Sequence, residues 1–148
     1  MNILLVEDRG EVSVYLKLAL RDDGHQVLDA FNPNDAMSHW NNRRTIPIDC
    51  IILDLNLRPD GLTETERKAS RGGLISGWLW LKDYVLTQKP DMASRTIVYS
   101  DYLHELQAAV TASEYQGVAL VPKKGRSSPA QEVMKHIQRI AGMSSSGR

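Results

Sequence analysis

The sequence predicts an α/β domain built on a parallel sheet. Short, fully apolar runs recur along the chain, each too short for a helix and each bounded by polar residues, which is typical of strands buried on both faces. Amphipathic helical patterns alternate with these runs, and most connections between them are short. Strict strand–helix alternation implies right-handed crossovers and helices on both faces of the sheet.

The composition indicates one soluble domain in a reducing compartment. We expect a single domain over residues 1–142 and a disordered tail over 143–148, in a chain of 148 residues. Basic and acidic residues are equal at 18 each, so no global basic field favours nucleic acid or anionic lipid. No apolar stretch reaches the roughly 18 residues of a membrane span, and no signal-peptide pattern starts the chain. The single cysteine, Cys50, allows no internal disulfide, and we expect a cytoplasmic location.

The first half of the chain reads as two strand–helix units. Ile3–Val6 is an apolar strand, and an apolar stripe over Glu11–Asp23 predicts a helix with a glycine just beyond it. Gln26–Phe31 predicts the second strand. Asn32 and Pro33 then supply an N-cap and a first-turn proline for a helix to about Trp40.

The second half continues the alternation. Asp49–Asn56 contains the apolar run Cys50–Leu53, the most clearly buried strand. A helix over Ser76–Thr87 places Trp78 in the core and Trp80 on another face, expected at the surface. The remaining predicted elements are a strand at Thr96–Ser100, a helix at Tyr102–Ser113, a strand at Val118–Val121 and a last helix opened by Ser128 and Pro129.

One segment interrupts this pattern. Arg58–Gly73 is too long and too polar for an ordinary strand-to-helix connection, and we expect it to be an inserted loop. Thr63 and Glu66 have capping-box spacing, so about two turns of surface helix, ended before Gly72, are expected within it. Its four basic and three acidic residues are typical of a solvated loop more than of a binding site.

Polar side chains follow four of the predicted strands where each strand ends. Glu7 and Asp8 follow the first strand, Asp54 the third, Ser100 the fourth and Lys123 the fifth. In a parallel sheet these ends share one edge, where open α/β sheets bind ligands. Taken singly, each residue has a plain structural reading, as a helix cap, a turn residue or a solvated lysine.

Together, these residue types point to phosphoryl chemistry. Three crowded carboxylates repel one another unless a cation joins them. An all-oxygen ligand set without histidine or cysteine suits Mg²⁺. A lysine ammonium and a serine hydroxyl are donors for phosphoryl oxygens, and a carboxylate such as Asp54 is a nucleophile able to form an acyl phosphate.

Four motifs at these strand ends resemble those of the receiver domains of two-component response regulators. They are ILLVED at Ile3–Asp8, IILDLNL at Ile51–Leu57, IVYS at Ile97–Ser100 and LVPKK at Leu120–Lys124. The resemblance covers essentially the whole chain. It implies a flavodoxin-like, doubly wound five-stranded parallel sheet of order 2-1-3-4-5 with five helices.

The resemblance also implies roles for individual residues. Asp54 resembles the phospho-acceptor aspartate, and Ser100 matches the switch hydroxyl that moves toward the phosphoryl group. Lys123 matches the lysine that pairs with this group, with Lys124 as the second choice if the strand ends one residue later.

A Mg²⁺ site is implied by the same resemblance. Asp8 corresponds to the direct metal ligand, with Glu7 assisting through water, and Asp54 also binds the ion. Asn56 would contribute its backbone carbonyl to the metal, while its side chain would face the phosphoryl site.

Three positions depart from the family pattern. Leu120 stands where an aromatic residue is usual, three positions before the lysine, which puts aromatic switching in doubt. Asp101 follows the switch hydroxyl, where a small residue is usual, so its carboxylate could crowd or repel the phosphoryl group or turn into solvent. Pro59 comes five residues after Asp54 and not four, and with the insertion it places extra chain beside the site.

The leading hypothesis is a stand-alone receiver phosphorylated on Asp54 by a histidine kinase or phosphotransfer protein. It would act on a separate effector protein, without direct contact to nucleic acid or membrane, as a self-phosphorylating and autodephosphorylating signalling domain more than a turnover enzyme. The alternative is a phosphorylation-independent interaction module of the same fold. A phosphohydrolase would need a general acid two residues after Asp54, a role that Asn56 cannot fill.

Overall fold

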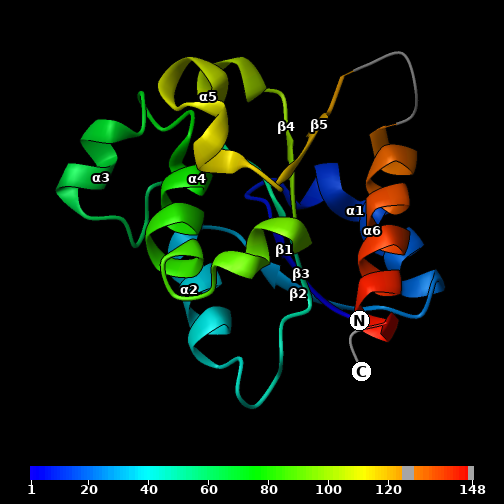
Figure 1. Ribbon diagram of the computed structural model, residues 1–148. Coiled ribbons are helices and arrows are strands. Elements are labelled where there is room, and N and C mark those ends of the chain that lie inside the picture. Colours follow the sequence, from blue (N-terminus) through cyan, green and yellow to red (C-terminus); the bar gives the residue numbers. More distant parts are fainter. Residues whose placement is uncertain (125–128, 147–148) are drawn as a thin grey trace.

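The computed structural model describes residues 1–124 and 129–146, and within them one parallel sheet lies between two layers of helices (Figure 1). The strand order β2-β1-β3-β4-β5 confirms the expected sheet and its order 2-1-3-4-5. The strands are β1 (Asn2–Val6), β2 (Gln26–Ala30), β3 (Cys50–Leu53), β4 (Thr96–Ser100) and β5 (Ala119–Pro122).

The helices cover both faces of this sheet. In Figure 1, α1 and α6 lie on one side, whereas α2, α4 and α5 lie on the other, with α3 further out. The α-helices are α1 (Gly10–Asp22), α2 (Pro33–Asn41), α3 (Glu64–Ala69), α4 (Ser76–Trp80), α5 (Leu103–Ala109) and α6 (Pro129–Ser146). A π-helical segment, η1 (Leu81–Leu86), and the 3₁₀ segments η2 (Pro90–Arg95) and η3 (Ala112–Tyr115) complete the described part. No helix among these residues has the length and apolar character to cross a membrane.

The strands divide their side chains between two cores, as the period of two requires. In β1, Ile3 and Leu5 pack with the α1 and α6 side, whereas Leu4 and Val6 pack with the α2 and α4 side. Cys50 belongs to the first of these cores and is fully buried, as expected for a central strand residue. This double burial explains why the central strands read as unbroken apolar runs.

Two helix starts are set by the predicted side chains. Asn32 accepts a hydrogen bond from the backbone N–H of Asp35 at 2.9 Å and precedes Pro33, which opens α2. In the insertion, Thr63 and Glu66 form the reciprocal capping box that starts α3. The expected surface helix in the insertion is therefore present.

Other elements differ from the sequence expectation. The predicted helix over residues 76–87 is α-helical only to Trp80 and then becomes π-helical. The surface position expected for Trp80 is wrong, because its side chain is 0% exposed. All five residues of α4 are buried, since α2 and α3 contact this helix in addition to the sheet. The helix predicted over 102–113 ends at Ala109, and the 3₁₀ segment η3 follows it.

The C-terminal helix is longer than expected. It runs from Pro129 to Ser146, past residue 142 where we placed the end of the domain and the start of a disordered tail. The last two residues of that tail, 147–148, lie outside the described residues. Ser128, expected as the N-cap of this helix, also lies outside them.

Candidate functional site at the carboxyl edge of the sheet

The ends of β1, β3 and β5 bring their polar residues together. Parallel pairing aligns β1 with β3 and carries Val6 opposite Leu53, so Glu7 and Asp54 leave the sheet side by side. The N–H of Asp54 donates to the carbonyl of Val6, and the N–H of Glu7 donates to the carbonyl of Ala30 at the end of β2. The convergence expected from strand ends is therefore observed.

Lys123 joins two of these carboxylates. Its Nζ lies 2.5 Å from Glu7 Oε2 and 2.9 Å from Asp54 Oδ2. All three side chains are largely buried, at 12% exposure for Lys123, 5% for Glu7 and 8% for Asp54. Because the carboxylates directly follow β1 and β3 and the lysine directly follows β5, the cluster links the ends of three strands at the edge of the sheet.

Burial and mutual charge shift the titration of this cluster. Desolvation, together with the Asp54 carboxylate, raises the pKa of Glu7 to about 7, although Lys123 opposes this shift. Burial alone would lower the pKa of Lys123, but the charges of Asp54 and Glu7 and hydrogen bonds to both leave it raised. The ammonium therefore stays charged and offsets two crowded acids.

Asp54 is held in place from both sides of its carboxylate. Oδ1 accepts the N–H of Leu55 at 2.7 Å, while Oδ2 faces Lys123. On the backbone, the carbonyl of Leu55 accepts the N–H of Gly77 at the start of α4. Hydrogen bonds to an ionised carboxylate orient it. The bond from Leu55 to Oδ1 therefore keeps Oδ2 of Asp54 directed toward the Lys123 ammonium.

The acidic residues fit a divalent metal. One carboxylate oxygen each of Glu7, Asp8 and Asp54 lies within 4.8 Å of the others. Asp8 is half-exposed and, among residues 1–124 and 129–146, forms no ion pair, so its oxygens can reach an incoming ion. Hard oxygen donors with an open side suit Mg²⁺, which keeps several of its waters when bound.

A small pocket of about 40 Å³ lies over this cluster. Its walls are Asp8, Arg9, Asp54, Asn56, Asp101, Tyr102 and Lys123. Arg9 and Tyr102 were not singled out from the sequence, although each stands one or two residues beyond a strand end that was. The backbone N–H of Arg9 donates to Glu7 Oε1 at 3.1 Å, which fixes the loop that leads from β1 into α1.

Known structures share this architecture. The receiver domain of a response regulator from Clostridium thermocellum superimposes with a TM-score of 0.69 at 19% identity, covering 99% of this chain and 98% of that one. NtrX from Brucella abortus, in complex with ADP, gives a TM-score of 0.69 at 20% identity over 99% of this chain. The fold is that of a receiver domain.

Further comparisons define the extent of this likeness. The non-phosphorylated HemR receiver domain from Leptospira biflexa gives a TM-score of 0.63 at 22% identity, over 94% of this chain and 92% of that one. The chain spans only 28% of the length of the Brucella NtrX chain. No protein-family model and no curated protein sequence match this chain.

Ser100 lies beside the pocket of this receiver fold, not on its wall. It is fully buried at the end of β4, and its Oγ accepts the N–H of Tyr102 at 3.1 Å. Its carbonyl accepts the N–H of Lys123. Ser100 thus anchors the loop that carries Asp101 and Tyr102. Of the two lysines considered from the sequence, Lys123 is the one whose ammonium contacts the carboxylates.

The departures from the receiver pattern have definite places. Asp101 is exposed and adds a third carboxylate to the pocket wall, beside those of Asp8 and Asp54. Leu120 is half-buried and packs against the core on the α2 and α4 side. The aromatic ring beside the lysine belongs instead to Tyr99 on β4, whose centroid is 5.6 Å from Lys123 Nζ. This position depends on the register of the two strands, in which Tyr99 is paired with Val121 across β4 and β5.

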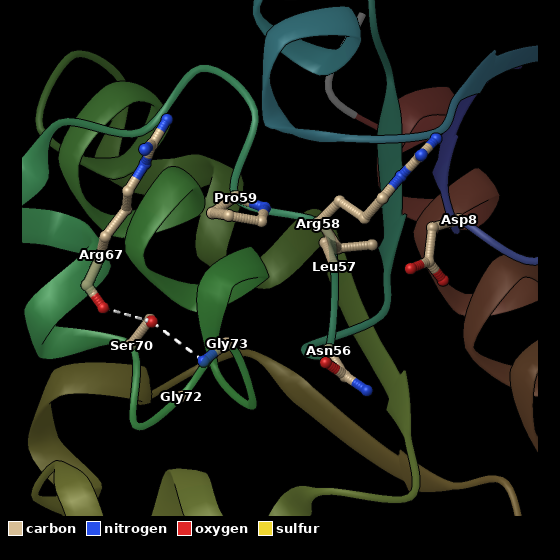
Figure 2. Close-up of a pocket in the computed structure, with 9 residues that line it drawn as sticks. All are labelled: Asp8, Asn56, Leu57, Arg58, Pro59, Arg67, Ser70, Gly72 and Gly73. Atoms are coloured by element: carbon tan, nitrogen blue, oxygen red, sulfur yellow. Dashed lines mark hydrogen bonds between the residues drawn. The ribbon is translucent and has the colours of Figure 1, made fainter.

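A second, larger pocket adjoins the first. It has a volume of about 350 Å³ and is lined by Asp8, Asn56, Leu57, Arg58, Pro59, Arg67, Ser70, Gly72 and Gly73 (Figure 2). Most of these residues belong to the insertion, so the extra chain does lie beside the site. Within this lining, Ser70 Oγ donates to the carbonyl of Arg67 and accepts the N–H of Gly73, which ties the end of α3 to the glycines that follow it (Figure 2).

Proposed function

We propose that the protein is a response-regulator receiver that accepts a phosphoryl group on Asp54. The observation that carries the proposal is the Lys123 ammonium held between Asp54 and Glu7, on a receiver fold, at the edge where the strand ends converge. A salt bridge with a purely structural role would need only one carboxylate beside Lys123. Phosphoryl transfer needs a nucleophile, a metal site and a cation close together, which here would be Asp54, the three carboxylates and Lys123.

The proposed reaction uses Oδ2 of Asp54, the oxygen that faces Lys123, as the nucleophile. This oxygen attacks the phosphorus of a phosphohistidine on a histidine kinase or phosphotransfer protein. The P–N bond breaks, the imidazole departs with the electron pair, and an acyl phosphate forms on Asp54. Lys123, released from its direct bond to Asp54, then pairs with an oxygen of the bound phosphoryl group.

Glu7, Asp8 and Asp54 would hold Mg²⁺, with the backbone carbonyl of Asn56 as a further ligand. Bound there, the metal would offset negative charge on the incoming phosphoryl group. The oxygen-only donor set and the 4.8 Å spread of its atoms support this assignment.

Ser100 is the proposed link between phosphorylation and output. Its hydroxyl already lies at the start of the loop to α5 and bonds the N–H of Tyr102. Turning toward a phosphoryl group would break that bond and shift the loop, so a separate effector protein could distinguish the two states. A cytoplasmic location is proposed with this role.

The alternative is an interaction module of the same fold that works without phosphorylation. Asp101 on the pocket wall favours it, because a third carboxylate there works against an incoming anion. The buried lysine and the three metal-spaced carboxylates favour the phosphorylated receiver, since a binding surface alone does not need charges desolvated at this cost.

Intact-mass analysis after incubation with Mg²⁺ and a small phosphoryl donor tests the proposal. We expect a labile adduct of one phosphoryl group on the wild type and none on Asp54→Asn. Omission of Mg²⁺ or substitution Asp8→Asn should slow labelling strongly. Asp49→Asn, which changes a carboxylate at the opposite end of β3, is the matched control and should label like the wild type. A wild type that acquires no adduct with any donor contradicts the proposal.

A further inference from the structure

Tyr99 lies against Lys123, the lysine at the centre of the proposed phosphoryl site. The centroid of its ring is 5.6 Å from Lys123 Nζ, with the ammonium over the ring. A cation within about 6 Å of the centroid is attracted to the negative face of an aromatic ring. Tyr99 is half-buried and packs against the core on the α1 and α6 side. The core therefore fixes the ring as a neighbour of the lysine.

Strand pairing brings the ring and the lysine together. Tyr99 is paired with Val121 across β4 and β5, and Lys123 follows Val121 by two residues. Because side chains along a strand alternate between its two faces, Val121 and Lys123 share the face of the sheet on which Tyr99 lies. The backbone N–H of Lys123 also donates to the carbonyl of Ser100, the residue after Tyr99. Leu120 packs on the opposite face, so a side chain at that position does not meet the lysine in this way.

The ring complements the hydrogen bonds of the ammonium. An ammonium carries three N–H donors. Two of them are used on Glu7 Oε2 and Asp54 Oδ2, and no third hydrogen-bond acceptor for Lys123 Nζ lies within residues 1–124 and 129–146. Because Lys123 is only 12% exposed, its charge needs a further favourable neighbour in place of the water it has lost. The face of the Tyr99 ring supplies that neighbour.

The hydroxyl of Tyr99 is not what the lysine contacts. Burial raises the pKa of Tyr99, although the charge of Lys123 opposes this shift. Three nearby acids raise the pKa further, namely Asp101, Glu7 and Asp54. The phenol therefore stays protonated near neutral pH and brings no negative charge to the lysine. The attraction comes from the ring.

We propose that Tyr99 is a positioning residue for the phosphorylation of Asp54, because its ring holds the Lys123 ammonium at the site. The inference rests on the proposed function and adds a residue of β4 to it. Before the reaction, Lys123 is held by Asp54 as well as by the ring. When the ammonium leaves Asp54 to pair with a phosphoryl oxygen, the first of these contacts is lost. The ring then keeps the lysine from turning into solvent, so the ammonium stays within reach of the phosphoryl group.

Two substitutions separate the ring from the hydroxyl. Tyr99→Leu keeps an apolar side chain without an aromatic face, whereas Tyr99→Phe keeps the face and lacks the hydroxyl. With Mg²⁺ and a small phosphoryl donor, we expect Tyr99→Leu to lower the initial rate of Asp54 labelling by about fivefold to thirtyfold, the range of a cation–π contact at a largely desolvated site. Tyr99→Phe should label within about twofold of the wild type, because phenylalanine offers a similar face.

NMR of the Lys123 ammonium gives a measurement that does not depend on phosphorylation. Protons over an aromatic ring are shielded by its ring current, so the ammonium protons should resonate upfield in the wild type and in Tyr99→Phe relative to Tyr99→Leu. Lys123→Arg removes the signal and thereby assigns it. Replacement of Tyr99 by fluorinated phenylalanines keeps the shape of the ring but weakens its negative face. Labelling should slow with each added fluorine, which tests the contact even if Tyr99→Leu fails to fold.

Tyr115→Leu is the matched control. Tyr115 is also half-buried, but its ring packs edge-on against Trp78 in the core on the α2 and α4 side. This variant should lose stability in urea as Tyr99→Leu does, yet label like the wild type. Equal slowing in both leucine variants, labelling of Tyr99→Leu like the wild type, or a lysine resonance that Tyr99→Leu leaves unchanged overturns the inference. A wild type that acquires no adduct contradicts the proposed function itself, and the inference falls with it.

Discussion

Gly77 is the residue at which α4 meets the strand that carries Asp54. A Cβ at this position would lie 2.1 Å from the carbonyl oxygen of Asp54 and 3.1 Å from Leu53 Cδ1. The N–H of Gly77 also donates to the carbonyl of Leu55 at 2.9 Å. The insertion separates these contacting residues in the sequence, and only the absence of a side chain lets the two backbones touch.

We expect Gly77→Ala to disturb both stability and the site. The added methyl group must push α4 away from β3 or displace Asp54, and overpacking of this kind typically costs about 1–3 kcal/mol of unfolding free energy. Labelling of Asp54 should slow as well, since its carboxylate is positioned through Leu55. Urea unfolding and the labelling rate provide the two measurements.

Gly142→Ala is the control for this substitution. Nothing lies within 4 Å of a Cβ at Gly142, which sits in α6, so alanine there should be neutral or stabilising by up to about 1 kcal/mol. If Gly77→Ala unfolds and labels like Gly142→Ala, close contact at Gly77 does not position Asp54.

Individual site residues were predictable where strand geometry fixes them. Glu7, Asp54 and Lys123 each stand directly after an apolar run, and a parallel sheet leaves only one edge for all three. Pairing within the cluster was not predictable, because the sequence does not indicate that Lys123 bonds Glu7 as well as Asp54. Tyr99 was missed for a similar reason, since its position beside Lys123 depends on the register of β4 against β5.

At the scale of elements, one acid anchors the insertion to the fold. Glu66 of α3 is buried and accepts hydrogen bonds from the N–H of Thr63 at 2.9 Å and from the hydroxyl of Tyr84 at 2.8 Å. The capping box was predictable from spacing, but the contact with Tyr84 was not. Tyr84 lies in the π-helical segment, where the 3.6-residue period used to read helical faces no longer holds.

Asp83 makes this anchor sensitive to pH. Burial, together with the adjoining Glu66 with which it shares a hydrogen bond, raises the pKa of Asp83 to about 6, from an ordinary 3.8. Protonated Asp83 can donate to Glu66, whereas ionised Asp83 repels it. Between about pH 4 and pH 6 the folded state thus holds the Asp83 proton more tightly than the unfolded state does. This contribution to stability is complete below pH 4 and is lost as the pH rises through 6.

Asp83→Asn should remove this loss, because the amide donates to Glu66 at every pH. We expect the melting temperature of the variant, relative to the wild type, to rise as the pH is raised from 4 to 7. Thermal unfolding across that range measures the difference. Asp22→Asn, at an exposed position on α1, is the control and should show no such trend. A constant difference for Asp83→Asn would show that Asp83 does not titrate against Glu66.

On the scale of the whole molecule, the insertion spans the carboxyl edge of the sheet. At one end, the N–H of Asn34 at the start of α2 donates to the carbonyl of Asp60. At the other, Arg71 Nε lies 3.0 Å from Glu105 Oε2 on α5. Strict alternation of elements predicted a parallel sheet, and the resemblance to receiver domains implied its strand order, but an irregular segment of mixed charge carries no period from which such contacts could be predicted.

The ion pair of Arg71 with Glu105 connects the insertion to α5, the helix that follows the loop anchored by Ser100. We expect Mg²⁺ with beryllofluoride, a phosphoryl mimic on Asp54, to change amide hydrogen exchange in α5 and, through Arg71 and Glu105, in residues 63–73. In Glu105→Gln the response of residues 63–73 should weaken by up to about fivefold, since an exposed ion pair contributes at most about 1 kcal/mol, while the response of α5 persists.

Glu132→Gln, which removes an exposed pair with Lys135 on α6, should respond like the wild type. A wild-type insertion whose exchange ignores beryllofluoride while α5 responds would mean that the ion pair transmits nothing, because a coupled pair must bias both of the segments it joins.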